Sequence, residues 1–163
     1  MPQVFLALGS NIEPKQQYLE RALKALAQRF PQGFSASHFY QSAPFGGLEQ
    51  ASYLNAACGF FTDLAAFDLL EYLLDLESRL GRVRTAMRWD ERTLDLDIAL
   101  YGDLVMQTDR LTLPHYDLTN RDFFLVPLLE LDPKLQDPRS GLSLAQALAE
   151  LDESKKTQLA KLE

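Results

Sequence analysis

The sequence predicts an α+β sandwich of the ferredoxin-like type, in which an antiparallel sheet carries packed helices and a C-terminal helical extension covers more of the sheet. The prediction rests on the order of the segments, which read as strand, helix, strand, strand, helix and strand before further helical segments follow. It also rests on length, because a chain of 163 residues can bury roughly 70% of its unfolded surface in one core. We therefore expect a single domain over residues 1–163.

The first two elements are a buried strand and an amphipathic helix. Residues 4–8 are apolar throughout, and Gly9, Ser10 and Asn11 then provide a turn. Pro14 is typical of the start of a helix. Apolar residues at helical spacing continue to the turn formers Pro31 and Gly33, and this stripe consists of Leu19, Ala22, Leu23 and Leu26.

Two further strands and a second helix follow. Residues 34–40 and 53–62 have strand character, and a connection rich in glycine, proline and serine separates them. Asp63 is expected to cap the second helix, and Gly81 stands where a helix would end. The buried stripe of this helix consists of Leu69, Leu73, Leu76 and Leu80.

The remaining elements begin with a strand at residues 93–101, reached through a long connection at residues 82–92 that we expect to move as a binding loop. A turn through Gly102 and Asp103, an extended segment at residues 111–115 and a helical region at residues 119–131 come next. A last helix is expected at about residues 142–151, and the polar residues after it are expected to fray.

Two aspartates give the most specific chemical signal. Leu94, Leu96, Ile98 and Leu100 alternate along the last strand, so Asp95 and Asp97 share its other face. Their alpha carbons would lie roughly 6.6 to 6.8 Å apart, which allows both carboxylates to hold one hard cation or a pair. The alternative is the solvated face of an antiparallel sheet, where charged residues are common.

Arginines near this strand favour the metal site over the solvated face. Arg79, Arg82, Arg84, Arg88 and Arg92 precede the aspartates, and no lysine occurs between Lys24 and Lys134. The planar arginine fork fits two phosphate oxygens at once. Carboxylates beside arginines therefore indicate a phosphate group held through a metal ion.

Composition and missing motifs exclude several classes of protein. A net charge of −7 opposes general binding to nucleic acid or anionic membranes. The first residues lack the features of a signal peptide, and no apolar run has membrane-spanning length, so we expect a cytoplasmic protein. Neither a Walker-type phosphate loop nor a GxGxxG motif is present.

Six segments resemble those of the 6-hydroxymethyl-7,8-dihydropterin pyrophosphokinase family of folate biosynthesis, in the family's order and spacing. They are LALGSN at Leu6, YLNAA at Tyr53, GRVR at Gly81, RWDERTLDLDI at Arg88, LTLPHYD at Leu111 and NRDFFLVPL at Asn120. The resemblance covers nearly the whole chain. It implies the same ferredoxin-like core and the transfer of pyrophosphate from ATP to the hydroxymethyl group of the pterin, giving AMP and the pterin diphosphate.

The resemblance also implies roles for residues around ATP. Asp95 and Asp97 would hold two magnesium ions, and Arg82 and Arg92 would act as catalytic residues that stabilise charge on the phosphates. ATP would be the co-substrate. The further residues implied to bind it are Glu77, Arg84, Arg88, Trp89, Ile98, Arg110, Thr112, His115, Tyr116 and Arg121.

For the pterin, the resemblance implies that aromatic side chains sandwich the flat ring and that an amide binds its edge. The residues implied are Ser42, Ala43, Phe45, Tyr53, Asn55, Trp89 and Phe123. The chain departs from the family pattern in two places, at Ser42-Ala43-Pro44-Phe45 and at Asp90-Glu91, where Gly-Pro is usual. We expect activity to survive these departures.

Two alternatives remain beside the pyrophosphokinase. One is a catalytically weak or silent relative that binds pterin or nucleotide, which the departures permit. The other is an RNA-binding module, which the acidic charge and the paired aspartates oppose. The expected partners are therefore the two small substrates, with no nucleic acid and no membrane, and the chain is expected to be a monomer.

Overall fold

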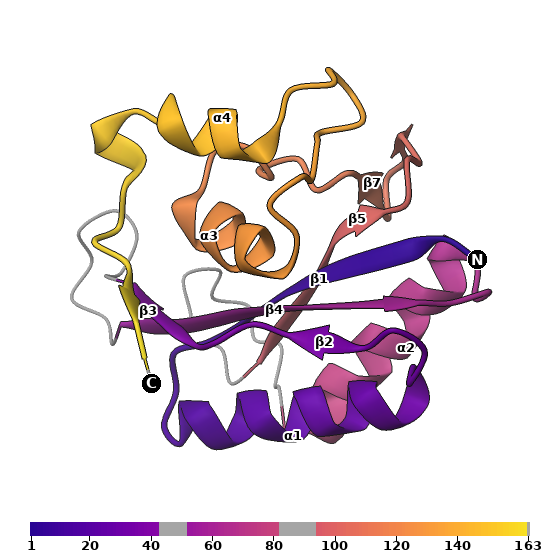
Figure 1. Ribbon diagram of the computed structural model, residues 1–163. Coiled ribbons are helices and arrows are strands. Elements are labelled where there is room, and N and C mark those ends of the chain that lie inside the picture. Colours follow the sequence, from indigo (N-terminus) through magenta and orange to yellow (C-terminus); the bar gives the residue numbers. More distant parts are fainter. Residues whose placement is uncertain (43–51, 82–93, 163) are drawn as a thin grey trace.

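The computed structural model of the chain describes residues 1–42, 52–81 and 94–162. Within them, an antiparallel six-stranded sheet lies between two layers of helices (Figure 1). The strand order is β5-β1-β4-β3-β8, and β2 pairs with β4 beside β3. The strands are β1 (Gln3–Ser10), β2 (Ser35–Ala36), β3 (Tyr40–Ser42), β4 (Tyr53–Phe61), β5 (Asp95–Tyr101) and β8 (Ala160–Lys161). The predicted α+β sandwich is confirmed.

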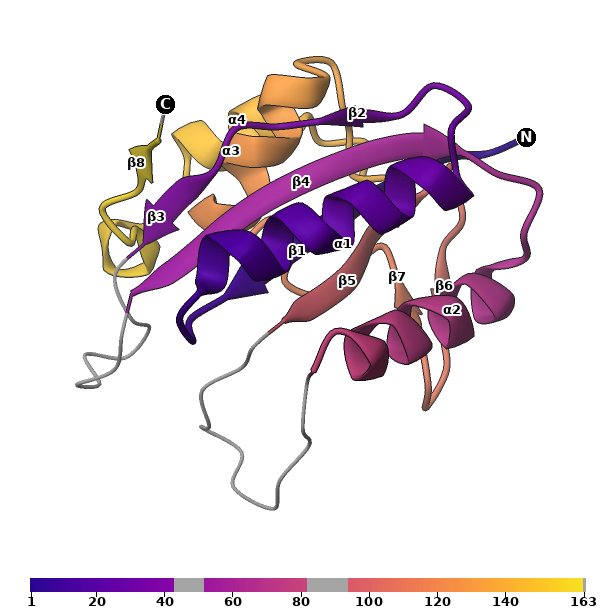
Figure 2. The ribbon, with the colours of Figure 1, turned by 90° about the horizontal axis from the view of Figure 1, so that it is seen from below.

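One face of the sheet packs on helices α1 (Lys15–Arg29) and α2 (Ala66–Arg79). Figure 2 shows this face, with α1 lying along β1 and β4 and α2 beside β5. The helical stripes predicted from the leucine spacing form this core, and the stacked rings of Phe30 and Phe60 close one end of it at 4.4 Å between centroids. Both helices lie here because each has one apolar face to bury.

The opposite face packs on helices α3 (Asp122–Leu131) and α4 (Leu144–Ala149). Phe5, Ala57 and Leu100 of the sheet contribute to this second core, together with Leu125 and Leu128 of α3. The predicted C-terminal extension is therefore real, and it covers the face that α1 and α2 leave open (Figure 1). A small hairpin of β6 (Met106–Gln107) and β7 (Thr112–Leu113) and a 3-10 turn, η2 (Glu153–Lys155), complete the described elements.

The single strand predicted for residues 34–40 is wrong, because the chain forms β2 and β3 with a bend between them. Ser37 makes this bend: its hydroxyl donates to the carbonyl of His38 at 2.8 Å and accepts from the backbone N–H of Ala57 at 2.9 Å. A serine side chain that bonds to backbone groups competes with the regular ladder. The alternation of apolar residues does not reveal this competition.

The predicted cap of the second helix is also wrong. The helix begins at Ala66 with Ala65 in the capping position and without a side-chain cap, so Asp63 lies too early in the chain. Gly81 was predicted correctly as the end of the helix, and its φ of +100° is a conformation that glycine adopts readily.

The prediction of a frayed C-terminus is wrong. β8 pairs with β3, and the backbone N–H of Leu162 donates to the carbonyl of Phe39 at 2.8 Å. The polar composition of this segment predicts disorder. Hydrogen bonds between its backbone and β3 order it instead.

β5 contains a bulge that interrupts the predicted alternation. Ile98 pairs with Leu6 and Leu100 pairs with Phe5, so Ala99 has no partner on β1. As a result, Leu94, Leu96 and Ile98 lie in the first core, whereas Leu100 lies in the second. The predicted placement of Leu100 is therefore wrong. The residues before the bulge alternate as predicted, which directs Asp95 and Asp97 to the side of α3.

Candidate active site

A pocket of about 460 Å³ opens on the α3 side of the sheet, beside the part that the second core covers. Its floor is formed by small residues of β1, since Ala7 and Gly9 leave space where larger side chains would fill it. Aligned strands place Ala7 opposite Asp97 and Gly9 opposite both Asp95 and Asn55. The lining residues are Ala7, Leu8, Gly9, Ser42, Tyr53, Asn55, Asp95, Asp97, His115, Tyr116, Asp117, Arg121, Phe123, Phe124 and Thr157.

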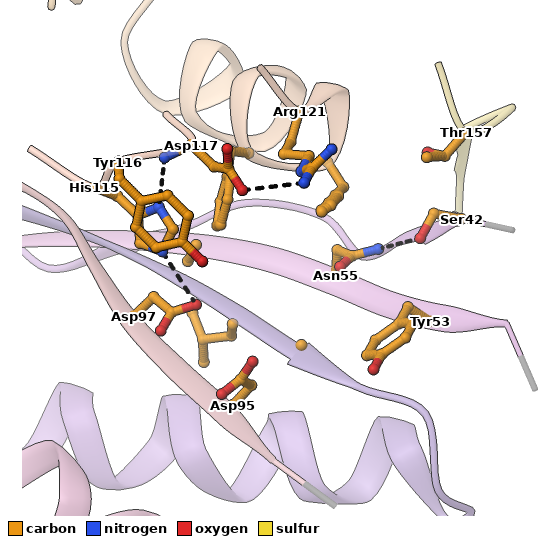
Figure 3. Close-up of a pocket in the computed structure, with 15 residues that line it drawn as sticks. Ser42, Tyr53, Asn55, Asp95, Asp97, His115, Tyr116, Asp117, Arg121 and Thr157 are labelled. Atoms are coloured by element: carbon orange, nitrogen blue, oxygen red, sulfur yellow. Dashed lines mark hydrogen bonds and ion pairs between the residues drawn. The ribbon is translucent and has the colours of Figure 1, made fainter. Parts of the chain in front are cut away.

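The two aspartates of β5 enter this pocket together, on its β5 side (Figure 3). Asp97 keeps 37% of its side chain exposed, so it remains accessible to a ligand. Two carboxylates on one strand face repel each other unless cations or donors compensate them, and hard cations prefer such oxygen ligands.

His115 faces this acidic pair. Its Nε2 lies 3.9 Å from Oδ2 of Asp97, and its Nδ1 accepts a hydrogen bond from the backbone N–H of Asp117 at 3.1 Å. Burial lowers the pKa of His115, against the opposite effect of the nearby carboxyls of Asp117 and Asp95. The ring is therefore neutral at pH 7, with the hydrogen on Nε2, the nitrogen that faces Asp97.

A guanidinium group lies on the opposite wall. Arg121 precedes α3, and its Nη2 lies 3.1 Å from Oδ2 of Asp117. Both side chains are about four-fifths buried, since 21% of Arg121 and 20% of Asp117 is exposed. Asp117 thus fixes two pocket groups, because its backbone orients His115 and its carboxyl holds Arg121.

The far end of the pocket carries the amide of Asn55, with the Tyr53 ring nearby. Asn55 is buried, and its Nδ2 donates to the hydroxyl of Ser42 at 2.8 Å, as Figure 3 shows. Tyr53 of β4 lies at the same end (Figure 3), and Phe123 of α3 also lines the pocket. Flat rings bind well between aromatic faces, and an amide can read the polar edge of such a ring.

Four residues predicted to bind the nucleotide lie outside the lining of this pocket, on the α2 side of β5. Glu77 of α2 is buried and accepts from the backbone N–H of Leu96 at 2.7 Å. Ile98 belongs to the first core, and Thr112 lies in β7. Arg110 pairs with Glu71 of α2 and lies over the ring of Phe67. The structure brings together only His115, Tyr116 and Arg121 from the described part of that predicted set.

Several predicted site residues lie outside the described residues. From the pterin set these are Ala43 and Phe45. From the catalytic and nucleotide sets they are Arg82, Arg84, Arg88, Trp89 and Arg92. The departures at Pro44, Asp90 and Glu91 lie there as well.

Sequence reasoning did not single out Asp117, Phe124 or Thr157, which also line the pocket. Asp117 could have been found, because it stands four residues before Arg121 and two after His115. Thr157 gave no signal, since only the folded C-terminal segment brings it to the pocket.

The fold and the pocket define a class of α+β enzyme in which an acidic site opens on the face of an antiparallel sheet. A family model described as 7,8-dihydro-6-hydroxymethylpterin-pyrophosphokinase matches residues 5–133. The chain therefore belongs to the 7,8-dihydro-6-hydroxymethylpterin-pyrophosphokinase family.

Individual relatives agree with this assignment. The chain is 45% identical over 143 residues to 2-amino-4-hydroxy-6-hydroxymethyldihydropteridine pyrophosphokinase of Haemophilus influenzae, covering 87% of this chain and 89% of the relative. The protein of the same name in Pseudomonas aeruginosa is 40% identical over 149 residues, with 90% of both chains covered.

Among solved structures, wild-type Plasmodium falciparum HPPK-DHPS with SDX-DHP is similar with a TM-score of 0.67 at 12% identity. The similarity covers 91% of this chain and 44% of that longer chain. At 12% identity, this similarity supports the fold and nothing further.

Proposed function

We propose that the pocket above β1, β4 and β5 is the active site in which this chain performs the reaction of its family. The chain is a pyrophosphokinase that transfers pyrophosphate from ATP to the hydroxymethyl group of 6-hydroxymethyl-7,8-dihydropterin. The hydroxymethyl oxygen bonds to the β-phosphorus of ATP, the bond from that phosphorus to the AMP oxygen breaks, and the hydroxyl proton is released. One observation carries the assignment of the site: Asp95 and Asp97 share a pocket with the buried amide of Asn55.

The acidic pair suits the metal that the reaction requires. Magnesium is held by one or two carboxylates together with substrate phosphates and water, so it needs no complete cage of protein ligands. Among the described residues, no three His, Cys, Asp or Glu side chains are placed so that they could hold a metal ion by themselves. We propose that Asp95 and Asp97 hold two magnesium ions, which would neutralise charge on the phosphates and on the leaving oxygen.

The wall opposite the aspartates is proposed to bind the ATP phosphates. Arg121 can present two N–H groups to phosphate oxygens while Asp117 fixes its orientation. His115 can donate from Nε2, and the exposed ring of Tyr116 stacks on it at 4.6 Å between centroids. These donors would stabilise the charge that develops during transfer.

We further propose that the nucleotide leaves the pocket across the edge of β5, toward the four predicted residues on the α2 side. Strand β5 lies at the edge of the described sheet, so no further strand of that sheet separates the pocket from this side. Glu77, Ile98, Arg110 and Thr112 flank this edge from α2, β5 and the hairpin. The roles of Arg82, Arg84, Arg88, Trp89 and Arg92 remain predictions from the resemblance.

The pterin is proposed to bind at the Asn55 end. Tyr53 and Phe123 would contact the two faces of the ring, and Asn55 would hydrogen-bond its edge. Ser42 would act indirectly, because its hydroxyl accepts from Nδ2 of Asn55 and so leaves the amide oxygen fixed. Ala43 and Phe45 remain predictions for the same loop.

The decisive experiment mixes the protein with 6-hydroxymethyl-7,8-dihydropterin, ATP and magnesium, and separates the products by chromatography. AMP and the pterin diphosphate should form in equal amounts, and omission of magnesium should abolish both. ADP or free phosphate as the nucleotide-derived product would contradict the proposal.

We also propose that the chain acts as one domain and as a monomer, since residues of a single chain line the whole described pocket. A cytoplasmic location fits its use of ATP and its single buried cysteine. Within residues 1–42, 52–81 and 94–162, no helix combines the length and apolar character needed to cross a membrane.

A further inference from the structure

The C-terminal strap, defined as residues 152–162, reaches the pocket at the end that carries Asn55. It leaves α4, passes the start of α3 and ends as β8 on the edge of β3 (Figure 1). Thr157, near its middle, lines the pocket at the same end as Ser42 and Asn55 (Figure 3). The strap is therefore a wall of the site as well as a terminal strand.

A pair of buried hydrogen bonds fastens the strap to α3. The backbone N–H of Thr157 donates to Oδ2 of Asp122 at 2.9 Å, and the Thr157 hydroxyl donates to Oδ1 at 2.8 Å. Asp122 is 5% exposed and Thr157 9%, so water competes little for these bonds. Directly after this attachment, Gln158 adopts a φ of +52°, a conformation that side chains other than glycine rarely hold without compensating contacts.

The position of Asp122 links the strap to both halves of the site. Asp122 is the first residue of α3, and it stands between Arg121 and Phe123, which both line the pocket. Beyond Thr157, β8 pairs with Tyr40 and Gln41 of β3, next to Ser42. One side chain thus connects the helix that presents Phe123 with the strand that presents Ser42.

Building on the proposed function, we propose that Asp122 and Thr157 are positioning residues for the pterin, which hold the strap and the first turn of α3 at the spacing that the pterin ring requires. Loss of the attachment removes the fastening of the strap to α3 and leaves its pairing with β3 through β8. Only a fraction of the molecules then holds the strap against α3. Because the pterin binds this fraction, the apparent affinity of the protein for the pterin falls. ATP contacts the other end of the pocket and is affected less.

The first test measures steady-state kinetics of the Thr157→Val variant, which lacks the hydroxyl donor but keeps the branched shape. We expect KM for 6-hydroxymethyl-7,8-dihydropterin to rise roughly five- to tenfold, the equivalent of one lost buried hydrogen bond, with KM for ATP changed less than about twofold. Thr157→Ser retains the hydroxyl and should restore the wild-type KM. An unchanged pterin KM in Thr157→Val would overturn the inference.

A matched control separates positioning from general loss of stability. Ser143 caps α4 by accepting from the backbone N–H of Gln146 at 3.1 Å, and it does not line the pocket. Ser143→Ala should lower Tm without raising KM for the pterin. Equal rises in KM in Ser143→Ala and Thr157→Val would show that stability alone is responsible and would overturn the inference.

The second test uses the wild-type chain and does not depend on a variant that folds. If pterin binding favours the attached strap, the attached strap is in turn stabilised by the bound pterin. Saturation with 6-hydroxymethylpterin should therefore slow hydrogen exchange at the amides of Thr157 and Leu162. A non-hydrolysable ATP analogue alone should slow exchange at these two amides less than the pterin does. Exchange that the pterin leaves unchanged would contradict the strap role. Wild-type protein that forms no AMP would instead contradict the proposed function.

Discussion

The carboxyl of Glu77 accepts a hydrogen bond from the backbone N–H of Leu96 at 2.7 Å, and this bond fixes β5 between its two aspartates. β5 is an edge strand of the described sheet, and the N–H of Leu96 points away from β1 toward α2. A side chain of α2 takes the place of the missing strand. Glu77 therefore stabilises the edge of β5, in addition to the role in nucleotide binding proposed for it.

Substitution Glu77→Ala should therefore lower the free energy of unfolding. The variant leaves the buried N–H of Leu96 without its carboxyl acceptor, at a cost of about 1 to 3 kcal/mol. Urea unfolding with an unchanged m-value measures this loss. Glu77→Gln keeps an acceptor oxygen and should lose less, whereas equal losses in the two variants would argue against the hydrogen bond as the cause.

Substitution Asp97→Asn should abolish most turnover while the fold remains. Removal of one carboxylate from the proposed metal site should lower kcat on the order of 1000-fold, which corresponds to several kcal/mol of lost charge stabilisation. Quenched-flow detection of AMP over a range of magnesium concentrations measures this effect. Near wild-type turnover would refute the metal role of Asp97, and binding of 6-hydroxymethylpterin should persist as the control.

Substitution Gly9→Ala should separate folding from pterin binding. A Cβ at Gly9 would lie 3.5 Å from Oδ1 of Asn55 and 3.9 Å from the Tyr53 ring, which are ordinary contacts. The free energy of unfolding should therefore change by less than about 1 kcal/mol. The added methyl enters the pocket floor, so affinity for 6-hydroxymethylpterin should fall roughly tenfold, as isothermal titration calorimetry would measure.

Gly59→Ala provides the contrast, since the same atom there would meet the Phe5 ring at 2.8 Å. This variant should lose about 1 to 3 kcal/mol of stability through overpacking in the second core. If Gly9→Ala proved as unstable as Gly59→Ala, the assignment of the pocket floor would be wrong.

Stability should fall in acid partly through Glu130. Partial burial acts to raise the pKa of this carboxyl, but hydrogen bonds from Tyr40 and His38 outweigh it and hold the pKa below its usual range. A lowered folded pKa stabilises the fold above the ordinary carboxyl value, and the contribution disappears as pH falls through the folded pKa. The difference in unfolding free energy between wild type and Glu130→Gln should therefore shrink from pH 7 to pH 3. A difference independent of pH would contradict this origin.

The sequence predicted the elements whose signal is local. Leucine spacing identified α1 and α2, and the alternation Leu94, Leu96, Ile98 placed Asp95 and Asp97 on one face. The bulge at Ala99 was not predicted, because it depends on how β5 pairs with β1 rather than on its own residues. For the same reason the break at Ser37 became visible only through its bonds to Ala57 and His38.

The lining of the pocket was predictable in part, whereas the roles of its residues stay predictions. Motif resemblance named Tyr53, Asn55, His115 and Arg121, and all four line the pocket. Thr157 could not be found in this way, since it is 35 residues from its partner Asp122 and its segment is polar. Composition predicts disorder for such a segment, whereas the hydrogen bonds that order it are formed by distant residues.

The bulge in β5 determines which changes in chain length leave the direction of Asp95 and Asp97 intact. A deletion of one residue between Asp97 and Leu100 would be absorbed at the unpaired Ala99, and the acidic pair would keep its direction. An insertion before Asp95 that shifted the strand by one position would exchange the two faces, so that leucines would enter the pocket and carboxylates the interior. Length variation among relatives should therefore be tolerated between Asp97 and Leu100, whereas changes that shift the register of Asp95 and Asp97 should not occur.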